Sequence, residues 1–189
     1  MSAKYEMRFT GSGGQGVILA SVILAEAAVL SDLNAIQSQA YGPEARGGAS
    51  KAECIISPEK IWFSKVQHPD FLLALTQSAL DKYAADLGPD AVVMIDDTLK
   101  APKNVRAENV ISVPILRSAV ETVGKAFTAN IVAVGAINAL LRLFDDDVLY
   151  EGVKRHIPAG TEEINLRALQ VGASLIGKEQ TKKHARSLR

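Results

Sequence analysis

A glycine-rich segment near the start of the chain, Gly11-Ser12-Gly13-Gly14-Gln15-Gly16, constrains the fold more than any other feature. Residues 5–10 before it alternate apolar and polar side chains as a strand does. Residues 17–30 after it contain neither glycine nor proline and are rich in Ala, Leu, Val and Ile. A strand, a glycine turn and a helix in this order form the first half of a βαβ unit. Because glycine lets a ligand approach the main chain and a helix start offers free N–H groups, the segment predicts a site for an anion, above all phosphate.

The residues that follow the turn narrow the choice of ligand. The glycines fit the G-x-G-x-x-G pattern of dinucleotide sites, which also places an acidic residue about 20 positions further on to bind the ribose. The expected second strand, 34–38, ends in Gln37-Ser38-Gln39 without a carboxylate, and Asp32 precedes it as a turn residue. NAD is therefore disfavoured. Two interpretations stay open: an anion or a partner backbone at the helix start, or a tight turn that only packs the helix on the sheet.

A second glycine-containing segment, 39–50, shows no helical or strand periodicity. Ligands of α/β sheets bind outside the carboxyl ends of strands, so we expect this segment to lie beside the glycine turn. Arg46 can donate two coplanar N–H groups to a phosphate or carboxylate, and Gly47-Gly48 lets its backbone come close. The alternative is a surface loop in which Glu44 and Arg46 pair incidentally. The length of the loop and the presence of Tyr41 favour contact with a ligand or partner.

The rest of the chain alternates strands with helices and then becomes helical. We expect strands at 51–57, 71–75, 91–96 and 109–113, and helices at 77–87, 118–125, 130–144, 146–156 and 161–178. This order predicts an α/β fold: a three-layer, Rossmann-like domain with a mostly parallel sheet and a helical C-terminal part. Asn130 begins one of these helices, where its ordinary role is an N-cap. Asp96-Asp97 is more typical of a strand end and turn than of a metal site.

Length and charge indicate one neutral domain. The 189 residues include 21 Lys or Arg and 21 Asp or Glu, so no overall basic field favours nucleic acid as a partner. A single domain over residues 1–177 is the simplest division. Residues 178–189 hold five Lys or Arg and one Glu. We expect this basic tail to be a solvated, disordered end outside the fold.

The single cysteine, Cys54, excludes an internal disulfide and any iron–sulfur or zinc site built from four cysteines of this chain. It alternates with Ala52 and Ile56 in a strand pattern, so a buried, unreactive thiol is expected. The three histidines show no ligand spacing, and no metal site is expected. The chain shows no signal peptide, and its longest apolar run, 131–141, is too short to span a bilayer. These features predict a cytoplasmic protein without membrane contact.

Three motifs taken together resemble those of a known family. The glycine turn 11–16, the segment Tyr41-Gly42-Pro43-Glu44-Ala45-Arg46-Gly47-Gly48 and the dipeptide Pro69-Asp70 look like the gamma subunit of 2-oxoacid:ferredoxin oxidoreductases. In single-chain members of that family the equivalent is a fused domain. The resemblance extends to about residue 177. The Glu-Ala-Arg-Gly-Gly form is closer to the 2-oxoglutarate or branched-chain enzymes than to the pyruvate enzymes, and the beta subunit of indolepyruvate oxidoreductase is similar as well.

The resemblance implies a role inside a complex. Such enzymes decarboxylate a 2-oxoacid on thiamine diphosphate, pass electrons through iron–sulfur clusters to ferredoxin and form acyl-CoA. It implies that alpha and beta subunits, and a delta subunit where the complex has one, hold the thiamine diphosphate, Mg²⁺ and the clusters. This chain would then carry no catalytic residue and would contribute to assembly and to binding of coenzyme A. The residues implied in that binding are Gly11, Gly13, Gly14, Gln15, Gly16, Tyr41, Glu44, Arg46, Gly47, Gly48 and Asn130.

Two other interpretations stay open. The chain could be an independent nucleotide-binding oxidoreductase, which would purify alone with activity and a tightly bound nucleotide. It could also be a purely structural subunit whose glycine turn binds nothing. As a gamma subunit the isolated chain is expected to be inactive and to contain neither iron nor thiamine diphosphate.

Overall fold

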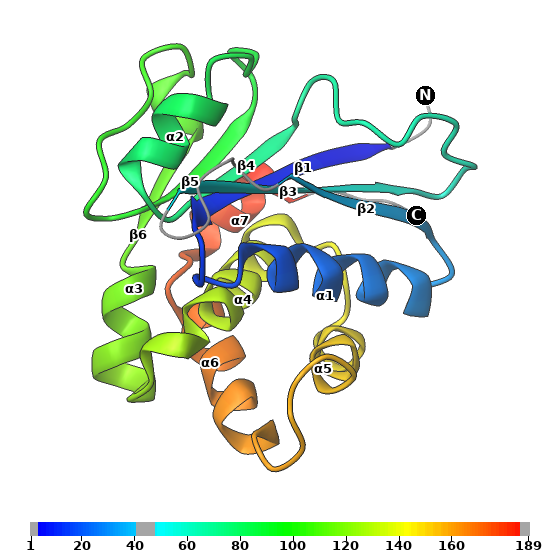
Figure 1. Cartoon of the computed structure of the whole chain (residues 1–189), viewed down its shortest axis with the longest axis vertical. Helices are drawn as coiled ribbons and strands as arrows, with labels where there is room; N and C mark the ends of the chain where they lie inside the picture. The colour runs from blue at the N-terminus through cyan, green and yellow to red at the C-terminus, as the bar shows by residue number, and fades with distance from the viewer. Residues whose placement is uncertain (1–3, 41–47, 186–189) are drawn as a thin grey trace.

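The computed structural model describes residues 4–40 and 48–185, and its centre is a six-stranded sheet with the order β2-β3-β1-β4-β5-β6 (Figure 1). The strands β4, β5 and β6 run parallel to β1, whereas β3 is antiparallel to both of its neighbours, β1 and β2. The strands are β1 Tyr5–Ser12, β2 Asn34–Ala40, β3 Ala49–Ser57, β4 Phe71–Ala74, β5 Val92–Asp96 and β6 Val110–Val113.

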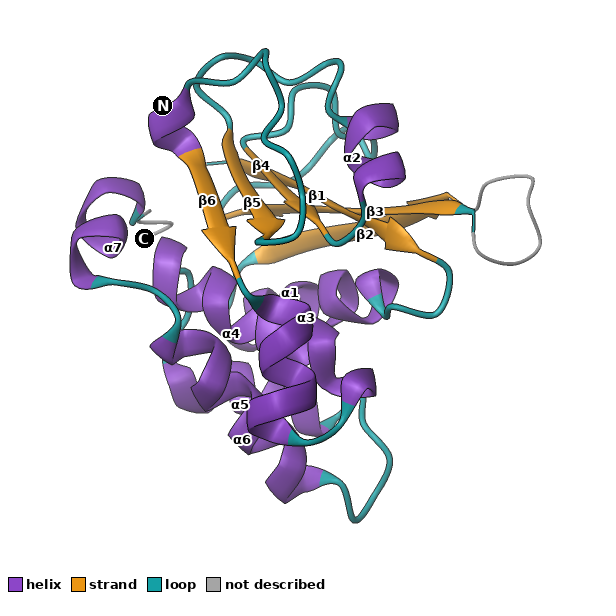
Figure 2. Ribbon diagram, turned by 90° about the vertical axis from the view of Figure 1, so that its left-hand side faces the viewer, coloured by secondary structure: helices purple, strands orange, loops and turns teal. Residues whose placement is uncertain are grey.

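Helices cover both faces of this sheet, which gives the three layers that were predicted (Figures 1 and 2). One face carries α1 and the C-terminal helices α4, α5 and α6, and the other carries the short helix α2. Between β6 and α4 lie α3, a π-helical turn at Ala119–Val123 and a 3₁₀ turn at Ala126–Thr128; another 3₁₀ turn, Ala107–Asn109, precedes β6. The helices are α1 Val17–Leu30, α2 Gln77–Tyr83, α3 Ile115–Ser118, α4 Ala129–Leu141, α5 Asp146–Lys154, α6 Glu162–Ser174 and α7 Lys178–His184.

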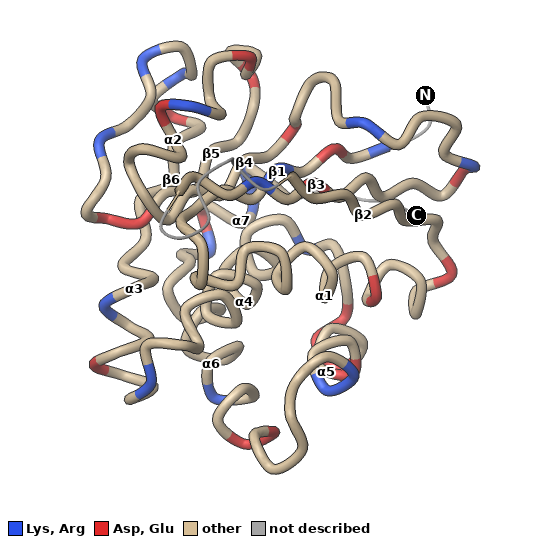
Figure 3. Tube along the Cα trace, in the orientation of Figure 1, with Lys and Arg blue, Asp and Glu red and all other residues tan. Residues whose placement is uncertain are grey.

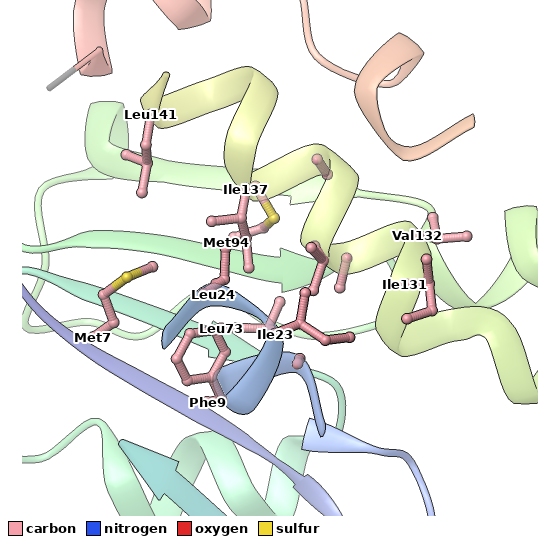
Figure 4. Packing of buried hydrophobic residues seen from close by; sticks show 14 of the residues in the cluster. Met7, Phe9, Ile23, Leu24, Leu73, Met94, Ile131, Val132, Ile137 and Leu141 are labelled. Carbon is pink, nitrogen blue, oxygen red and sulfur yellow. The ribbon is translucent and has the colours of Figure 1, made fainter. Parts of the chain in front are cut away.

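The main hydrophobic core lies between the sheet and the larger helical layer. Met7 and Phe9 of β1 point into it and are fully buried, together with Ile23 and Leu24 of α1 (Figure 4). Helix α4 is buried along almost its whole length because α6 packs closely on its outer side, where a Cβ atom on Gly172 would overlap the carbonyl group of Val132. Burial of this amount of apolar surface is the main force that holds the layers together.

The opposite face of β1 is polar, although it is also covered. Arg8 is only 4% exposed; its Nε donates to Glu53 of β3 at 2.9 Å, and its Nη1 donates to the carbonyl oxygen of Tyr83 at 2.9 Å and forms an ion pair with Asp86. Burial alone would lower the pKa of Arg8, but its bonds to the two carboxylates raise it. Because these bonds join β1, β3 and the end of α2, they hold the second helical layer on the sheet.

Several sequence predictions differ from the structure in detail. The helix α1 begins and ends where expected, but the helix expected at 77–87 ends at Tyr83, and the one expected at 118–125 is a short α-helix followed by a π turn. The second and third strands form an antiparallel hairpin inside the mostly parallel sheet. Sequence patterns give the strands but not their partners, because pairing depends on contacts distant in the chain.

The expectation of a disordered basic tail is wrong for residues 178–184, which form α7. Thr181 donates its hydroxyl to the carbonyl oxygen of Ala139 at 2.9 Å, and His184, three residues later, is 4% exposed. Residues three apart lie on one face of a helix, so α7 packs this face on α4 and leaves its lysines exposed. Because most residues of this segment are charged, the sequence alone did not indicate that Thr181 and His184 contact the rest of the fold.

Candidate functional site

The carboxyl ends of the parallel strands form one edge of the sheet, called here the carboxyl edge, which faces the viewer in Figure 2. After β1 the chain continues into α1 on one face of the sheet, and after the neighbouring strand β4 it continues into α2 on the other face. The carboxyl ends of β1 and β4 are therefore a topological switch point. In open α/β sheets, ligands bind just outside such a point.

The glycine turn lies at this switch point and has the backbone angles that only glycine adopts readily. Gly14 has φ of +94°, and Gly16, the N-cap of α1, has φ of +73°. A Cβ atom on Gly11 would lie 2.7 Å from Gln15 Oε1, which accepts the Ser12 N–H at 2.7 Å. The turn therefore needs its glycines both for its backbone conformation and for the space that the Gln15 side chain occupies.

The start of α1 is open to a negatively charged ligand. No side chain caps its N-terminus, and its first turn contains no acidic residue. Between Arg8 and Glu26 the chain has no charged residue at all, as the uncharged turn and first part of α1 in Figure 3 show. The helix dipole and the free N–H groups favour an anion there, and no nearby carboxylate in this stretch would repel it.

The β3 end of the loop between β2 and β3 lies beside the turn. Ser12 pairs with Ala49 in the β1–β3 ladder, and the N–H of Gly13 donates to the carbonyl oxygen of Gly48 at 3.3 Å. Tyr41, Glu44, Arg46 and Gly47 lie outside the described residues. The structure thus brings Gly48 to the glycine turn.

Asn130 lies against the other end of the turn. Helix α4 begins at Ala129 with Thr128 as N-cap, so Asn130 is not the N-cap that was predicted. It is 4% exposed, its Oδ1 has no hydrogen-bond partner among the residues that the structure describes, and a Cβ atom on Gly16 would lie 2.6 Å from its Nδ2. A buried amide oxygen without a partner is unfavourable. The start of α1 therefore has a hydrogen-bond acceptor beside it that the described residues leave unsatisfied.

Thr76, which lies two residues after the end of β4, was missed by the sequence analysis. Its Oγ1 is closed to solvent and has no hydrogen-bond partner. The available signal was its position, because a hydroxyl residue between an apolar strand and a helix falls at the carboxyl edge, where ligands were expected.

Other polar residues singled out in the sequence have structural roles. Asp96 accepts the N–H and hydroxyl of Thr98 and, through Oδ2, the N–H of Leu116 at 2.8 Å, so it closes a turn as expected. Asp70 of the Pro69-Asp70 motif lies at the opposite edge of the sheet, where its Oδ2 accepts the N–H of Glu6 at 2.8 Å.

Cys54 is a buried free thiol, and burial raises its pKa to about 12. Within residues 4–40 and 48–185, no three His, Cys, Asp or Glu side chains are grouped to hold a metal ion, and no helix is long and apolar enough to cross a membrane.

Comparison with known proteins gives the family. The pyruvate ferredoxin/flavodoxin oxidoreductase family matches residues 6–175. The chain belongs to this family. The predicted resemblance to its gamma subunits is therefore confirmed, and the glycine turn, Gly48, Thr76 and Asn130 all lie within the matched region.

Individual relatives match over nearly the whole chain. The 2-oxoglutarate synthase subunit KorC of Methanocaldococcus jannaschii is 44% identical over 170 residues, which is 88% of this chain and 91% of KorC. The crystal structure of a keto/oxoacid ferredoxin oxidoreductase gamma subunit from Geobacter sulfurreducens is 42% identical with a TM-score of 0.80, covering 91% of this chain and 95% of that one. A 2-oxoglutarate:ferredoxin oxidoreductase from Magnetococcus marinus, solved with 2-oxoglutarate, coenzyme A and succinyl-CoA bound, shares the fold at 20% identity and a TM-score of 0.80. It covers 97% of this chain but only 32% of its own.

Proposed function

We propose that this protein is the gamma subunit of a 2-oxoglutarate:ferredoxin oxidoreductase complex. The identity to KorC over most of both chains supports the subunit type and the substrate, and the Geobacter gamma subunit supports its occurrence as a separate chain. The complex would convert 2-oxoglutarate and coenzyme A into succinyl-CoA and CO₂, with two electrons passed to ferredoxin. This chain would contribute to assembly and to binding of coenzyme A.

The remaining chemistry would belong to partner subunits. With one cysteine, this chain cannot supply the four thiolates of an iron–sulfur cluster. Alpha and beta subunits, and a delta subunit where present, would therefore hold the clusters, thiamine diphosphate and Mg²⁺, and would deliver electrons to ferredoxin. A cytoplasmic location fits a chain whose single cysteine is a buried free thiol.

The observation that carries the coenzyme A proposal is the unpartnered Oδ1 of Asn130 beside Gly16 at the start of α1. The helix start favours the phosphates of coenzyme A, and Oδ1, which can only accept a hydrogen bond, matches one of the N–H or hydroxyl groups that coenzyme A also carries. The Magnetococcus enzyme, which has the same fold within a longer chain, was solved with coenzyme A bound. Arg46, in the loop whose end contacts the turn, would supply the positive charge that the turn itself lacks.

Gly14→Val in the assembled complex tests this proposal, and Gly160→Val is its matched control. Both glycines have positive φ, +94° and +85°, and a Cβ atom on either would meet nothing within 4 Å. The two variants therefore introduce similar backbone strain, but only the valine at position 14 would occupy space at the candidate site. We expect Gly14→Val to raise the Michaelis constant (KM) for coenzyme A by about tenfold or more, because charge-assisted contacts are lost, and Gly160→Val to leave it unchanged.

The result also separates the other interpretations. An unchanged KM and dissociation constant for coenzyme A in Gly14→Val would favour a purely structural subunit. An independent nucleotide-binding oxidoreductase would show activity as a purified single chain. We expect that chain to be inactive and free of stoichiometric iron in metal analysis.

A further inference from the structure

Thr76 occupies a position where a threonine normally caps a helix, but it does not cap one. It is the N-cap of α2 with extended backbone angles (φ −144°, ψ 148°), and no side-chain capping bond is formed. An N-cap threonine usually accepts an N–H from the first turn of the helix. Here its Oγ1 is closed to solvent and has no hydrogen-bond partner within the described ranges 4–40 and 48–185. An unsatisfied buried hydroxyl is destabilising, so the arrangement calls for a partner that residues 4–40 and 48–185 do not supply.

The position of Thr76 relates it to the glycine turn. The preceding residue, Leu75, donates its N–H to the carbonyl oxygen of Thr10 at 3.0 Å. The Cβ atom of Leu75 lies 3.5 Å from where a Cβ on Gly11 would be. The turn therefore begins beside the Leu75–Thr76 segment and ends against Asn130. Two buried polar atoms without partners thus flank the turn, one on each side of the switch point.

We propose that Thr76 is a further ligand-binding residue of this site, whose hydroxyl donates a hydrogen bond to a phosphate oxygen of the ligand. The inference rests on the proposed binding of coenzyme A at the glycine turn. Thr76 as a residue is half-buried, so rotation about its Cα–Cβ bond moves the hydroxyl from its enclosed position to the ligand. The bond formed there satisfies the hydroxyl that the described residues leave unpaired.

The test is Thr76→Val in the assembled complex, since valine keeps the shape of threonine and removes only the hydroxyl. We expect the KM for coenzyme A, and its dissociation constant from calorimetry, to rise about five- to tenfold, the usual effect of one lost hydrogen bond. The KM for 2-oxoglutarate should stay unchanged, and the thermal unfolding midpoint should stay the same or rise, because no bond to a described residue is lost and an unsatisfied hydroxyl is removed. Thr76→Ser should restore most of the affinity.

Thr98→Val is the matched control at the end of the neighbouring strand. The Thr98 hydroxyl donates to Asp96 Oδ1 at 2.6 Å, so this variant should lower the unfolding midpoint and leave coenzyme A binding unchanged. Normal coenzyme A affinity in Thr76→Val together with impaired affinity in Gly14→Val would overturn the role of Thr76 alone. Normal affinity in both would overturn the proposed site and this inference with it. A lower unfolding midpoint with normal affinity in Thr76→Val would show that the hydroxyl is structural and would also overturn the inference.

Discussion

Two asparagines of helix α4, one near each end, are equally buried but differ in their partners. Asn138 is 1% exposed; its Nδ2 donates to the carbonyl oxygen of Phe144 at 3.0 Å, and its Oδ1 accepts the N–H of Phe144 at 3.1 Å. Asn130 is 4% exposed, and its Oδ1 accepts no hydrogen bond. The helix, the residue type and the burial are shared, so the presence or absence of partners distinguishes the two ends.

Under our proposal, the difference separates a residue that holds the fold from residues that contact the ligand. Asn138 fastens the turn between α4 and α5, which includes Arg142 in a left-handed conformation (φ +55°). The Oδ1 of Asn130 makes no hydrogen bond to a described residue, and its side chain lies against Gly16, the N-cap of α1. A buried polar group is normally retained because it is satisfied. The proposed ligand would supply the partner that the described residues do not give Asn130, and Thr76 repeats this pattern across the switch point.

The largest effect is expected at the satisfied end. Asn138→Leu would leave both the N–H and the carbonyl group of Phe144 buried without partners, so we expect a loss of about 3 kcal/mol in the free energy of unfolding. Urea denaturation of the purified chain measures this loss. Coenzyme A kinetics of the assembled complex should be normal, and a raised KM for coenzyme A would remove the distinction between the two ends.

Arg46 extends the comparison to charge. It lies outside the described residues, in the loop whose last residue, Gly48, accepts a hydrogen bond from Gly13. If it closes over an anion at the turn, Arg46→Ala should raise the KM for coenzyme A by roughly ten- to a hundredfold and the KM for 2-oxoglutarate much less. Arg46→Lys should recover only part of the loss because an ammonium group lacks the planar fork. Weakened subunit assembly with normal kinetics of the intact complex would instead assign Arg46 to a partner contact.

Asn130→Leu gives the direct contrast with Asn138→Leu. No hydrogen bond within the chain is lost, so the free energy of unfolding should stay the same or rise. The KM for coenzyme A should rise by about fivefold, as for one lost hydrogen bond. A clear loss of stability with normal coenzyme A binding would mean that Asn130 is structural after all.

The sequence was sufficient to predict the glycine turn, the helix after it and the carboxyl edge of the sheet. It was not sufficient to predict which polar side chains there are hydrogen-bonded. The glycine turn and α1 follow from local patterns, since the glycines open the helix at Val17 and the chain leaves it at Ser31 before Asp32, which has φ of +59°. The carboxyl edge follows from the alternation of strands and helices. The sequence analysis proposed Asn130 as a site residue and also expected it to be the N-cap of its helix. Thr128, two residues earlier, is an equally suitable N-cap residue type, and a sequence cannot choose between the two.

Hydrogen-bond satisfaction is not visible in a sequence. Thr76 and Thr98 are both hydroxyl residues that follow apolar strands, and only the three-dimensional structure shows that one is bonded and the other is not. The prediction of a disordered tail was wrong for a related reason. Thr181 and His184 sit among lysines, and their burial depends on the surface of α4 that they meet.

Gln15 is intermediate between the two asparagines, because its side chain is hydrogen-bonded within the chain but lies at the glycine turn. Its substitution gives the smallest expected effect on the KM for coenzyme A. Its Oε1 accepts the N–H of Ser12 at 2.7 Å, so the turn satisfies one of its own donors with a side chain from within the turn. A neutral amide oxygen at that N–H occupies a place that an oxygen of an anionic ligand could take. We therefore expect the ligand to displace it, and displacement lowers the apparent affinity.

Two substitutions of Gln15 should then act in opposite directions. Gln15→Ala should lower the KM for coenzyme A by about three- to fivefold, the equivalent of one neutral hydrogen bond that no longer has to be broken. Gln15→Glu should raise it, because a carboxylate holds the N–H more strongly and repels phosphate. Gln180→Ala is the control: the Gln180 Oε1 also accepts the backbone N–H of the residue three positions earlier, that of Gly177 at 2.9 Å, but in the C-terminal helix α7, and its loss should leave the KM for coenzyme A unchanged. A rise in KM with Gln15→Ala would show instead that the Gln15 side chain binds the ligand directly, as the resemblance to the gamma subunits implies.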